Sequence, residues 1–269
     1  MDLGLEGKVV VVTAATANIG RGIALEFASE RAKVVAVGRD EEAGRALVSA
    51  ARDRGAEEAI FISADLRAPS APALVVAEAE KLGPIEVLVN NLGGNVGRSC
   101  FVDSEATDWA EDIDLNFGTL LRMTHPVLKL MVPRKSGSIV NVGSTAGLVG
   151  DYMLPIYSAM KGAVHSFTTV LAKEVGQHNI RVNAIAPYAT FATAPEAFSK
   201  GSRFHPQLGS WATAEALSAE EQALMQRTTL VGRPFASPED LSGIVALLAS
   251  QRASFVTGQI WPVDGGSLL

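Results

Sequence analysis

The chain has 269 residues, a formal net charge of −6 and a pI near 5.3. This acidic balance, with scattered basic residues, argues against a nucleic-acid partner. The single cysteine, Cys100, excludes an intrachain disulfide and fits a reducing compartment. No apolar run reaches the roughly 18–20 residues that span a bilayer, and the first residues lack the layout of a signal peptide. We therefore expect a soluble, cytoplasmic protein with no membrane partner.

Apolar segments of strand length alternate with helix-like segments along the chain. The predicted strands are residues 8–13, 33–38, 59–63, 85–90, 137–143, 180–185 and 259–263. Helical spacing appears at 19–31, 41–54, 71–82, from about 104 past Asn116, at 158–175 and from 237 onward. Strands that are apolar throughout predict a parallel sheet covered by helices on both faces. We expect one α/β domain over residues 1–269, a Rossmann-type doubly wound sheet of about seven strands with ligands outside the carboxyl ends of the strands.

The turn after the first predicted strand reads TAATANIG over residues 13–20. Small residues here let the backbone approach a pyrophosphate, and the start of the next helix supplies N–H donors and the positive end of its dipole. Only Gly20 is a glycine, so a tight packing turn without a ligand is an equally good interpretation of this segment alone.

A hydroxyl, a phenol and an amine converge after the strand at 137–143. Tyr157 and Lys161 are four residues apart, so a helix through them places both side chains on one face, one turn apart. Ser144, at the end of the strand, faces the same crevice. A free phenol has a pKa of about 10, and a nearby ammonium stabilises the phenolate and lowers that value. The three residues predict a site for proton transfer.

The motifs taken together resemble the short-chain dehydrogenase/reductase family over nearly the whole chain. They are TAATANIG at 13–20, ADL at 64–66, NNLG at 90–93, DLN at 114–116, Ser144 with YSAMK at 157–161, NAIAPY at 183–188, GRP at 232–234 and VDGG at 263–266. Each motif is common by chance, whereas this order and spacing are specific.

The resemblance implies an oxidoreductase that exchanges a hydride between a nicotinamide cofactor and a small alcohol or ketone. It implies catalytic roles for Ser144, Tyr157, Lys161 and Asn116: Tyr157 as acid/base, Ser144 on the substrate oxygen, Lys161 on the ribose and Asn116 on a water of a proton relay. The implied cofactor-binding residues are Thr13, Ala15, Asn18, Ile19, Gly20, Arg39, Asp65, Leu66, Asn91, Gly93, Tyr157, Lys161, Pro187 and Thr190. No metal is needed, and a homo-oligomer, tetramer or dimer, is implied.

The sequence departs from the family pattern at three glycine positions, which hold Ala14, Asn18 and Tyr188. We expect alanine to fit only if φ is negative there. Asparagine is among the residues that best tolerate a positive φ, and its amide could donate to phosphate or ribose. We expect cofactor binding to survive with a slightly altered turn.

The end of the second predicted strand bears on the choice of cofactor. An acid there would accept a hydrogen bond from the ribose 2′-OH and select NAD. This chain has Gly38 followed by Arg39, which leaves room for a 2′-phosphate and a guanidinium to bind it. Asp40 could reach the ribose if the loop shifts by one residue, and Arg39 could simply be solvated. NADP(H) is favoured, with NAD(H) possible.

Residues 188–231 are the least patterned part of the chain, with helical stretches near 194–198 and 213–226. A loop of this length is typical of a lid that excludes water. Its aromatic residues suit an apolar, cyclic or aromatic substrate, although any one of them could instead pack at a hinge or subunit contact. The expected substrate-binding residues are Ser144, Asn95, Leu154, Tyr188 and Trp211.

These observations favour an NADP(H)-preferring enzyme that interconverts a secondary alcohol and a ketone. The first alternative is chemistry like that of halohydrin dehalogenases, which use the same scaffold without a nicotinamide. The corresponding motif of those enzymes is Ser…Tyr…Arg, whereas this chain has lysine at position 161. The second alternative is a non-catalytic NADP(H)-binding sensor, which has no use for the proton-transfer residues.

Overall fold

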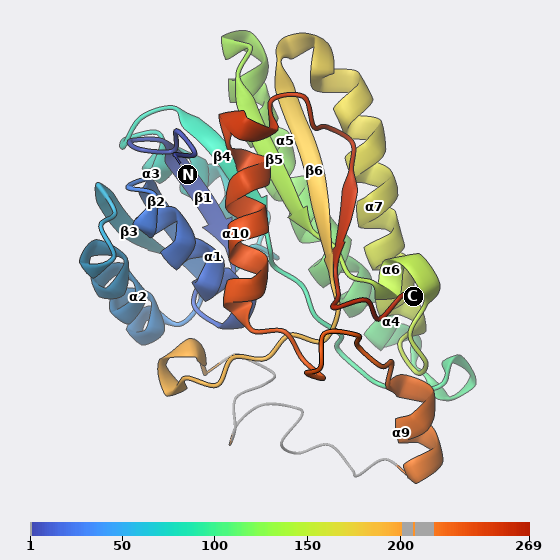
Figure 1. Ribbon diagram of the computed structural model, residues 1–269. Coiled ribbons are helices and arrows are strands. Elements are labelled where there is room, and N and C mark those ends of the chain that lie inside the picture. Colours follow the sequence, from blue (N-terminus) through green and yellow to red (C-terminus); the bar gives the residue numbers. More distant parts are fainter. Residues whose placement is uncertain (1, 201–206, 208–217) are drawn as a thin grey trace.

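The computed structural model describes residues 2–200, 207 and 218–269 (Figure 1). Within these residues, seven strands form one parallel sheet in the order β3-β2-β1-β4-β5-β6-β7. The strands are β1 (Val9–Thr13), β2 (Lys33–Gly38), β3 (Glu58–Ser63), β4 (Ile85–Asn90), β5 (Gly137–Val142), β6 (Ile180–Pro187) and β7 (Ile260–Val263). The doubly wound parallel sheet that the sequence predicts is confirmed.

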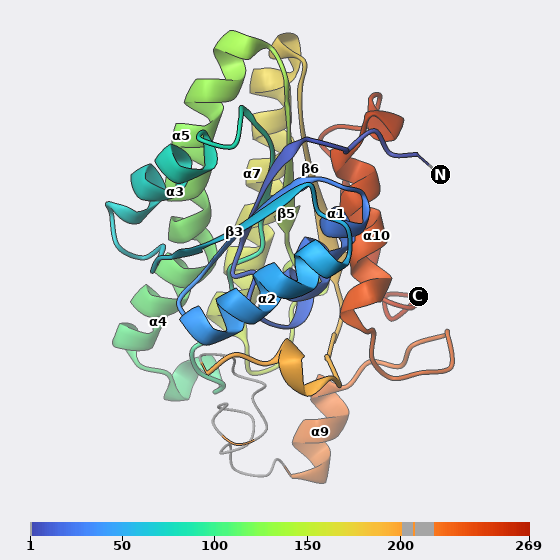
Figure 2. The ribbon, with the colours of Figure 1, turned by 90° about the vertical axis from the view of Figure 1, so that its left-hand side faces the viewer.

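Helices cover both faces of this sheet (Figure 2). The helices α1 (Asn18–Ser29), α2 (Glu41–Asp53) and α10 (Pro238–Ala249) pack on one face, and α3 (Ala71–Ala79), α5 (Thr119–Arg134) and α7 (Pro155–Val175) pack on the other. Phe27 and Leu241 are fully buried in the first layer, and Met123 and Val127 are fully buried in the second. Because the strands in the middle of the sheet are covered on both faces, their sequences are mostly apolar, as in β1, which is valine at every position except Thr13.

The direction of strand order reverses between β1 and β4. From β1 the chain proceeds outward to β2 and β3, and β4 then pairs with the opposite edge of β1. In a doubly wound sheet such a reversal opens a crevice at the carboxyl ends of the two strands, because their following segments leave toward opposite faces. The fold thus places a ligand site next to the turn after β1 and the loop after β4.

The long helix expected from residue 104 onward contains a wide turn. It consists of α4 (Ala106–Ile113), a π-helical turn η2 (Asp114–Gly118) and α5 in direct succession. Asn116 sits in the π turn with 1% of its surface exposed. A π turn inserts one residue into the regular winding and is often found at functional sites.

The segment between β6 and α10 lies beyond the carboxyl end of the sheet (Figures 1 and 2). It contains the short 3₁₀ helix η4 (Pro195–Ala197) and the helix α9 (Ala219–Met225). Its two ends meet, because Thr190 pairs with Ala236 as an isolated β-bridge and the Phe191 and Phe235 rings lie 4.8 Å apart, edge to face. Residues 208–217, which include part of the helical stretch expected at 213–226, lie outside the described residues.

The remaining described elements are short. They are η1 (Phe101–Asp103), α6 (Ala146–Val149), η3 (Gly176–His178) and η5 (Gln251–Ala253). Helix α10 begins as the sequence predicts, with Ser237 donating its N–H to the Asp240 carboxylate at 2.7 Å. This contact satisfies a backbone donor at the start of the helix.

Candidate functional site

A cavity of about 730 Å³ opens at the carboxyl ends of the strands. The predicted residues that line it are Asn18, Ile19, Gly20, Arg39, Asp65, Leu66, Asn91, Gly93, Asn95, Ser144, Leu154, Tyr157, Lys161, Pro187, Tyr188 and Thr190. Thr13, Ala15 and Asn116 lie behind the wall of the cavity, and Trp211 lies outside the described residues. The structure therefore gathers residues from the whole length of the chain at the crevice predicted from the strand order.

One wall of the cavity is the start of helix α1. Ala17 precedes the helix in an extended conformation and offers no side-chain cap, and the first turn carries no acidic residue. Ile19 and Gly20 line the cavity here. A Cβ atom at Gly20 would lie 2.2 Å from the Ala14 carbonyl oxygen, so only glycine fits. An uncapped helix start of this kind is an anion site, which fits a pyrophosphate group.

The turn before α1 adopts positive φ angles without glycine. Ala14 has φ of +50° and Asn18 has φ of +43°. The expectation that alanine fits only with a negative φ is therefore wrong, whereas asparagine takes the left-handed conformation as expected. The strained Ala14 backbone is held by Asn91, whose Nδ2 donates to the Thr13 and Ala14 carbonyls at 2.9 and 3.1 Å. A left-handed alanine costs about 1 kcal/mol, and these hydrogen bonds offset it.

Thr13 and Ala15 support this wall from within the core. The Thr13 hydroxyl accepts hydrogen bonds from the backbone N–H groups of Asn91 and Leu92 at 2.8 and 3.0 Å. Ala15 is fully buried and donates its N–H to the Val37 carbonyl at 2.9 Å. Their contacts join the ends of β1, β2 and β4, and thereby fix the turn that faces the cavity.

Both polar atoms of the Asn18 side chain form hydrogen bonds within the protein. Its Nδ2 donates to the Thr190 carbonyl at 3.1 Å, and its Oδ1 accepts the Ala192 N–H at 3.0 Å. The amide that could have met a phosphate or ribose thus binds the backbone after β6. Asn18 links the turn at 13–20 to the segment that begins the predicted lid.

The carboxyl end of β2 leaves Arg39 at the cavity and Asp40 engaged elsewhere. A Cβ atom at Gly38 would lie 2.9 Å from Thr16 Cγ2, so the glycine makes room for the turn after β1. Asp40 caps α2 by accepting two backbone N–H groups, and its other oxygen accepts the Lys200 N–H at 2.8 Å. The hydrogen bond from Lys200 lowers the pKa of Asp40. Both carboxylate oxygens are therefore held away from a ribose.

Asp65, after β3, is paired with an arginine at the rim of the cavity. Its carboxylate accepts the Arg67 N–H at 3.0 Å and lies 3.2 Å from Arg67 Nη2. Partial burial alone would raise the pKa of Asp65, but the hydrogen bonds from Arg67 hold it below its usual range. Arg67 also pairs with Glu111 at 3.0 Å. This network fixes Asp65 and Leu66 at the wall opposite α1.

The hydroxyl, phenol and amine converge as the spacing predicts. Ser144 follows β5, is 8% exposed, and its Oγ accepts the Ala146 N–H at 3.1 Å. Helix α7 then presents Tyr157 and Lys161 to the same cavity. Lys161 is 3% exposed, its Nζ lies 5.7 Å from the centre of the Tyr157 ring, and it donates to the Val142 carbonyl at 2.9 Å. The ammonium group is thus buried beside the phenol.

Gly93 lies where two polar side chains converge behind the cavity. A Cβ atom at this position would lie 2.8 Å from Asn116 Oδ1 and 2.9 Å from Lys161 Nζ. The Asn116 side chain accepts the Gly94 N–H at 2.9 Å and donates to the carbonyls of Gly94 and Asp112 at 2.8 and 2.9 Å. Asn116 therefore fastens the loop after β4 to the π turn.

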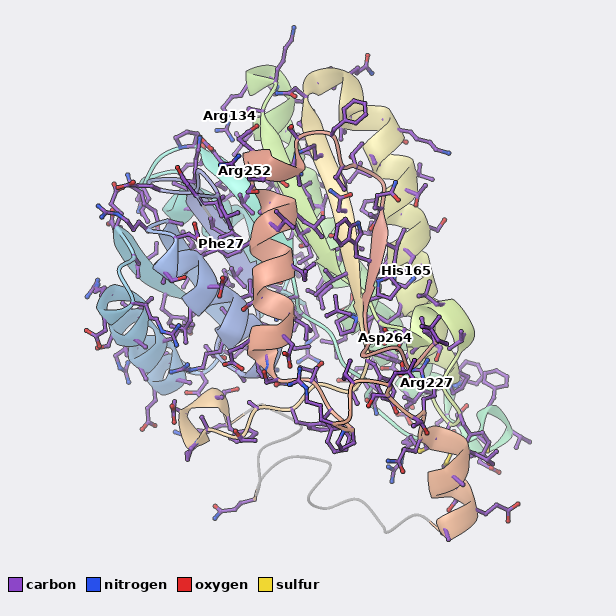
Figure 3. The ribbon with its side chains drawn as sticks, viewed as in Figure 1. Phe27, Arg134, His165, Arg227, Arg252 and Asp264 are labelled. Carbon is purple, nitrogen blue, oxygen red and sulfur yellow. The ribbon has the colours of Figure 1, made fainter. Side chains whose placement is uncertain are left out.

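His165 continues the polar face of α7, one turn beyond Lys161. It lies on α7 (Figure 3), is 6% exposed, and the polar groups that act on its imidazole in the described part of the chain are the Gly147 backbone and Lys161. Burial, together with the positive charge of Lys161, lowers the pKa of His165 to about 4. The imidazole is neutral at pH 7, so Lys161 is the charged member of this face.

Two charged residues at the Ser144 end of the cavity, Asp151 and Arg227, were not predicted from the sequence. Arg227 Nη2 lies 3.0 Å from Asp151 Oδ1, and Asp151 lines the cavity. The position of Asp151 in the short connection between Ser144 and Tyr157 was a weak signal that could have been used, although other residues of that connection, such as Tyr152, are exposed. Arg227 carried no such signal, since it lies in the least patterned segment.

The described part of the chain holds neither a cluster of metal ligands nor a helix that could cross a membrane. No group of three or more histidine, cysteine, aspartate or glutamate residues there could hold a metal ion. In the same residues, no helix has both the length and the apolar character needed to cross a membrane.

Comparisons with known proteins agree with the fold and identify the family. The family model described as short chain dehydrogenase matches residues 8–200. The chain is 34% identical to a 3beta-hydroxysteroid dehydrogenase of Mediterraneibacter gnavus, over 96% of this chain and 94% of the relative. It is 32% identical to the 3-oxoacyl-[acyl-carrier-protein] reductase FabG of Chlamydia muridarum, over 99% of both chains.

A solved structure extends this agreement to three dimensions. The crystal structure of NAD+-bound xylitol dehydrogenase superposes with a TM-score of 0.83 at 27% identity, covering 97% of this chain and 99% of the other. The strand order, the Tyr157–Lys161 pair and these matches lead to one conclusion. The chain is an oxidoreductase of the short-chain dehydrogenase/reductase family.

Proposed function

We propose that the protein is an NADP(H)-preferring enzyme that interconverts a secondary alcohol and a ketone. The observation that carries the proposal is the burial of the Lys161 ammonium 5.7 Å from the Tyr157 ring, in the cavity that also holds Ser144. Lysines are rarely this buried, and the hydrogen bond to Val142 satisfies one of the three donors of the ammonium group, so its place beside a phenol that lines a cavity supports a role in proton transfer.

The nicotinamide cofactor, when bound, supplies the hydride. The residues around the cavity fit it: the start of α1 suits the pyrophosphate, and Asn91, Gly93 and Lys161 line the wall between the two ends. In the proposed reduction, Tyr157 donates its proton to the substrate oxygen, and Lys161 stabilises the phenolate that remains. Ser144 donates a hydrogen bond to the same oxygen and stabilises its charge. In oxidation Tyr157 accepts the proton.

The preference for NADP(H) is supported by the end of β2. Arg39 lines the cavity, and the two acids that line it nearby are already engaged: Asp40 caps α2 and binds Lys200, and Asp65 pairs with Arg67. A guanidinium suits a 2′-phosphate better than a 2′-hydroxyl. The similar xylitol dehydrogenase binds NAD+, so Arg39 is the feature on which this part of the proposal depends.

The proposed substrate has an apolar, cyclic or aromatic body. Leu154, Phe191 and Phe235 line the cavity together with Tyr188 and Met225, and residues 188–231 act as the lid over it. The similarity to a 3beta-hydroxysteroid dehydrogenase supports a cyclic secondary alcohol. A homo-oligomer and a cytoplasmic location remain predictions from the sequence.

Cofactor titration tests the proposal directly. Fluorescence titrations with NADPH and NADH give both dissociation constants, and we expect the lower one for NADPH. A panel of cyclic and aromatic ketones, followed at the cofactor absorbance, should then give turnover with NADPH. Binding of NADPH without turnover of any carbonyl compound would indicate a sensor, and absence of binding would indicate chemistry without a nicotinamide.

A further inference from the structure

Asp151 and Arg227 form an ion pair inside the protein, at the substrate end of the cavity. Asp151 lies in the connection from Ser144 to Tyr157 and lines the cavity with both. Its side chain is 22% exposed and that of Arg227 is 20% exposed. The pair therefore does not resemble the solvated ion pairs of a protein surface, which contribute little to stability.

The Arg227 guanidinium is held from several directions (Figure 3). Besides Asp151, its Nη2 donates to Thr145 Oγ1 at 2.8 Å, and its central carbon lies 4.6 Å from the centre of the Tyr188 ring. The backbone of Arg227 is fixed as well, because the Tyr188 hydroxyl accepts the backbone N–H of Arg227 at 2.9 Å and donates to its backbone carbonyl at 3.2 Å. A guanidinium fixed in this way fixes the carboxylate paired with it.

The carboxylate of Asp151 is open to the cavity on one side. Its Oδ1 faces Arg227, whereas the described residues donate no hydrogen bond to Oδ2, and Asp151 itself lines the cavity. Burial raises the pKa of Asp151, and the charge of Arg227 only partly opposes this. Arg227 Nε and Nη1 are buried without a hydrogen-bond partner among the described residues, and Arg227 is not one of the residues that line the cavity. A molecule in the cavity therefore meets the pair through the Asp151 carboxylate.

We propose that Asp151 accepts a hydrogen bond from a second hydroxyl group of the substrate, remote from the oxygen that Ser144 and Tyr157 handle, and that Arg227 positions Asp151 for this contact. The inference rests on the proposed alcohol–ketone activity and narrows its substrate class to diols and hydroxyketones. The ion pair is neutral overall, so it selects neither a cation nor an anion. A carboxylate oxygen that reaches the cavity and receives no hydrogen bond from the described residues can accept one from a neutral hydroxyl group.

The experiment compares alcohols that differ by one hydroxyl group. The pairs are cyclohexanol with the cyclohexanediols, 2-butanol with 2,3-butanediol, and 1-phenylethanol with 1-phenylethane-1,2-diol, each with saturating NADP+. In the wild-type protein, we expect kcat/KM for the better diol to exceed that for its parent alcohol by about 10- to 100-fold, the range for a hydrogen bond to a charged group. In Asp151→Ala this ratio should fall to near one, mainly through KM of the diol.

Two further variants separate recognition from structural damage. Arg227→Lys keeps the charge but loses the planar donor over Tyr188, and should lower the ratio part of the way. Glu80→Gln is the matched control, because Glu80 pairs with Arg134 at 3.1 Å with both side chains 30% exposed, and neither residue lines the cavity. It should leave the ratio unchanged. A lid that is merely loosened lowers both kcat/KM values together and does not change their ratio.

The outcomes distinguish this inference from the proposed function. Turnover of the parent alcohols with no preference for any diol, or a preference that survives in Asp151→Ala, overturns the inference and leaves the alcohol–ketone activity standing. No turnover of any alcohol, or of the matching ketones with NADPH, overturns both.

Discussion

The two ends of the cavity differ in the groups that form them. The nucleotide end consists of backbone and small residues fixed to the sheet, such as the 13–20 turn, Gly38 and Gly93. The substrate end depends on side chains of the segment after β6, where Tyr188 and Arg227 meet Thr145 and Asp151 through hydrogen bonds and charge. The nucleotide end is thus sensitive to added volume, and the substrate end is sensitive to lost polar contacts.

The two ends are joined at defined places. Asn18 binds the backbone at Thr190 and Ala192, and Asp40 and Glu42 bind Lys200. The segment after β6 therefore touches the start of α1 and the start of α2 before it reaches α9. Changes at these contacts affect the substrate end and the nucleotide end together.

The largest expected effect comes from removing the phenol that both ends share. Tyr157→Phe should lower kcat by at least about 100-fold, the lower limit for general acid–base catalysis, with the NADPH dissociation constant nearly unchanged. Steady-state kinetics and fluorescence titration measure the two quantities. Tyr152→Phe is the control, because Tyr152 is an exposed phenol in the same connection and should retain activity. Retained turnover in Tyr157→Phe would reject the proposed acid/base.

The sensitivity of the nucleotide end to volume is tested at Gly93. In Gly93→Ala the new methyl group would meet Asn116 Oδ1 and Lys161 Nζ at less than 3 Å, so Lys161 must move. A shift of about 1 Å can cost about 100-fold in rate, and we expect kcat to fall by about that factor. Gly97→Ala provides the control, since its nearest neighbour would be Asp108 at 3.6 Å. Equal kinetics for the two variants would show that Asn116 and Lys161 can move to accommodate the methyl group without loss of activity.

The link between the ends is tested at Asn18. Asn18→Gly keeps the positive φ but removes both hydrogen bonds to the segment after β6. At about 1 kcal/mol for each bond, we expect the NADPH dissociation constant to rise by up to about 30-fold. Trypsin should also cleave faster after Lys200, the one basic residue of 188–200. Tight NADPH binding and unchanged cleavage in this variant would mean that the link has no role in closing the site.

A smaller effect is expected when the residue proposed to bind the 2′-phosphate of the cofactor is removed. Arg39→Ala should reduce the ratio of kcat/KM for NADPH over NADH by about five- to tenfold, because a charge-assisted hydrogen bond in solvent contributes about 1 kcal/mol or somewhat more. Arg45→Ala is the control, since Arg45 pairs with Glu41 on the exposed face of α2. An unchanged ratio in Arg39→Ala would show that a group other than Arg39 binds the 2′-phosphate.

The smallest effect concerns the neutral imidazole behind Lys161. The pKa of His165 in the fold is about 4, below the value of about 6.5 for a free histidine. The unfolded chain therefore binds the proton more tightly, and the stability that His165 contributes above pH 6.5 is lost as the pH falls toward 4. Tm measured from pH 7 to pH 5 should fall less in His165→Leu than in wild type. His125→Leu, at an exposed position, should follow wild type.

The elements were predictable because their pattern is local and strong. Each strand of the sheet is a short, mostly apolar run, and Tyr157 and Lys161 share a helix face by spacing alone. The wide turn at Asn116 was not predictable, because no residue type marks a π turn. The left-handed Ala14 was predicted wrongly, since it depends on hydrogen bonds from Asn91, a residue far away in sequence.

The substrate end was the least accessible to prediction for the same reason. Arg227 meets Asp151 and Tyr188 only after the chain has closed, and nothing in the composition of 188–231 indicates which of its residues turn inward. Trp211, expected at the substrate, lies outside the described residues. Long-range pairs of this kind leave no periodicity to detect.

At the π turn Asp114–Gly118, the structure depends more on how many residues the turn contains than on which residue types they are. Deleting a single residue there would restore regular winding and rotate everything downstream by about 100° relative to the loop after β4. Asn116 would then lose its hydrogen bond from the Gly94 N–H, or Met123 and Val127 would leave the core. The helix therefore tolerates substitution along its exposed face far better than any change in its length.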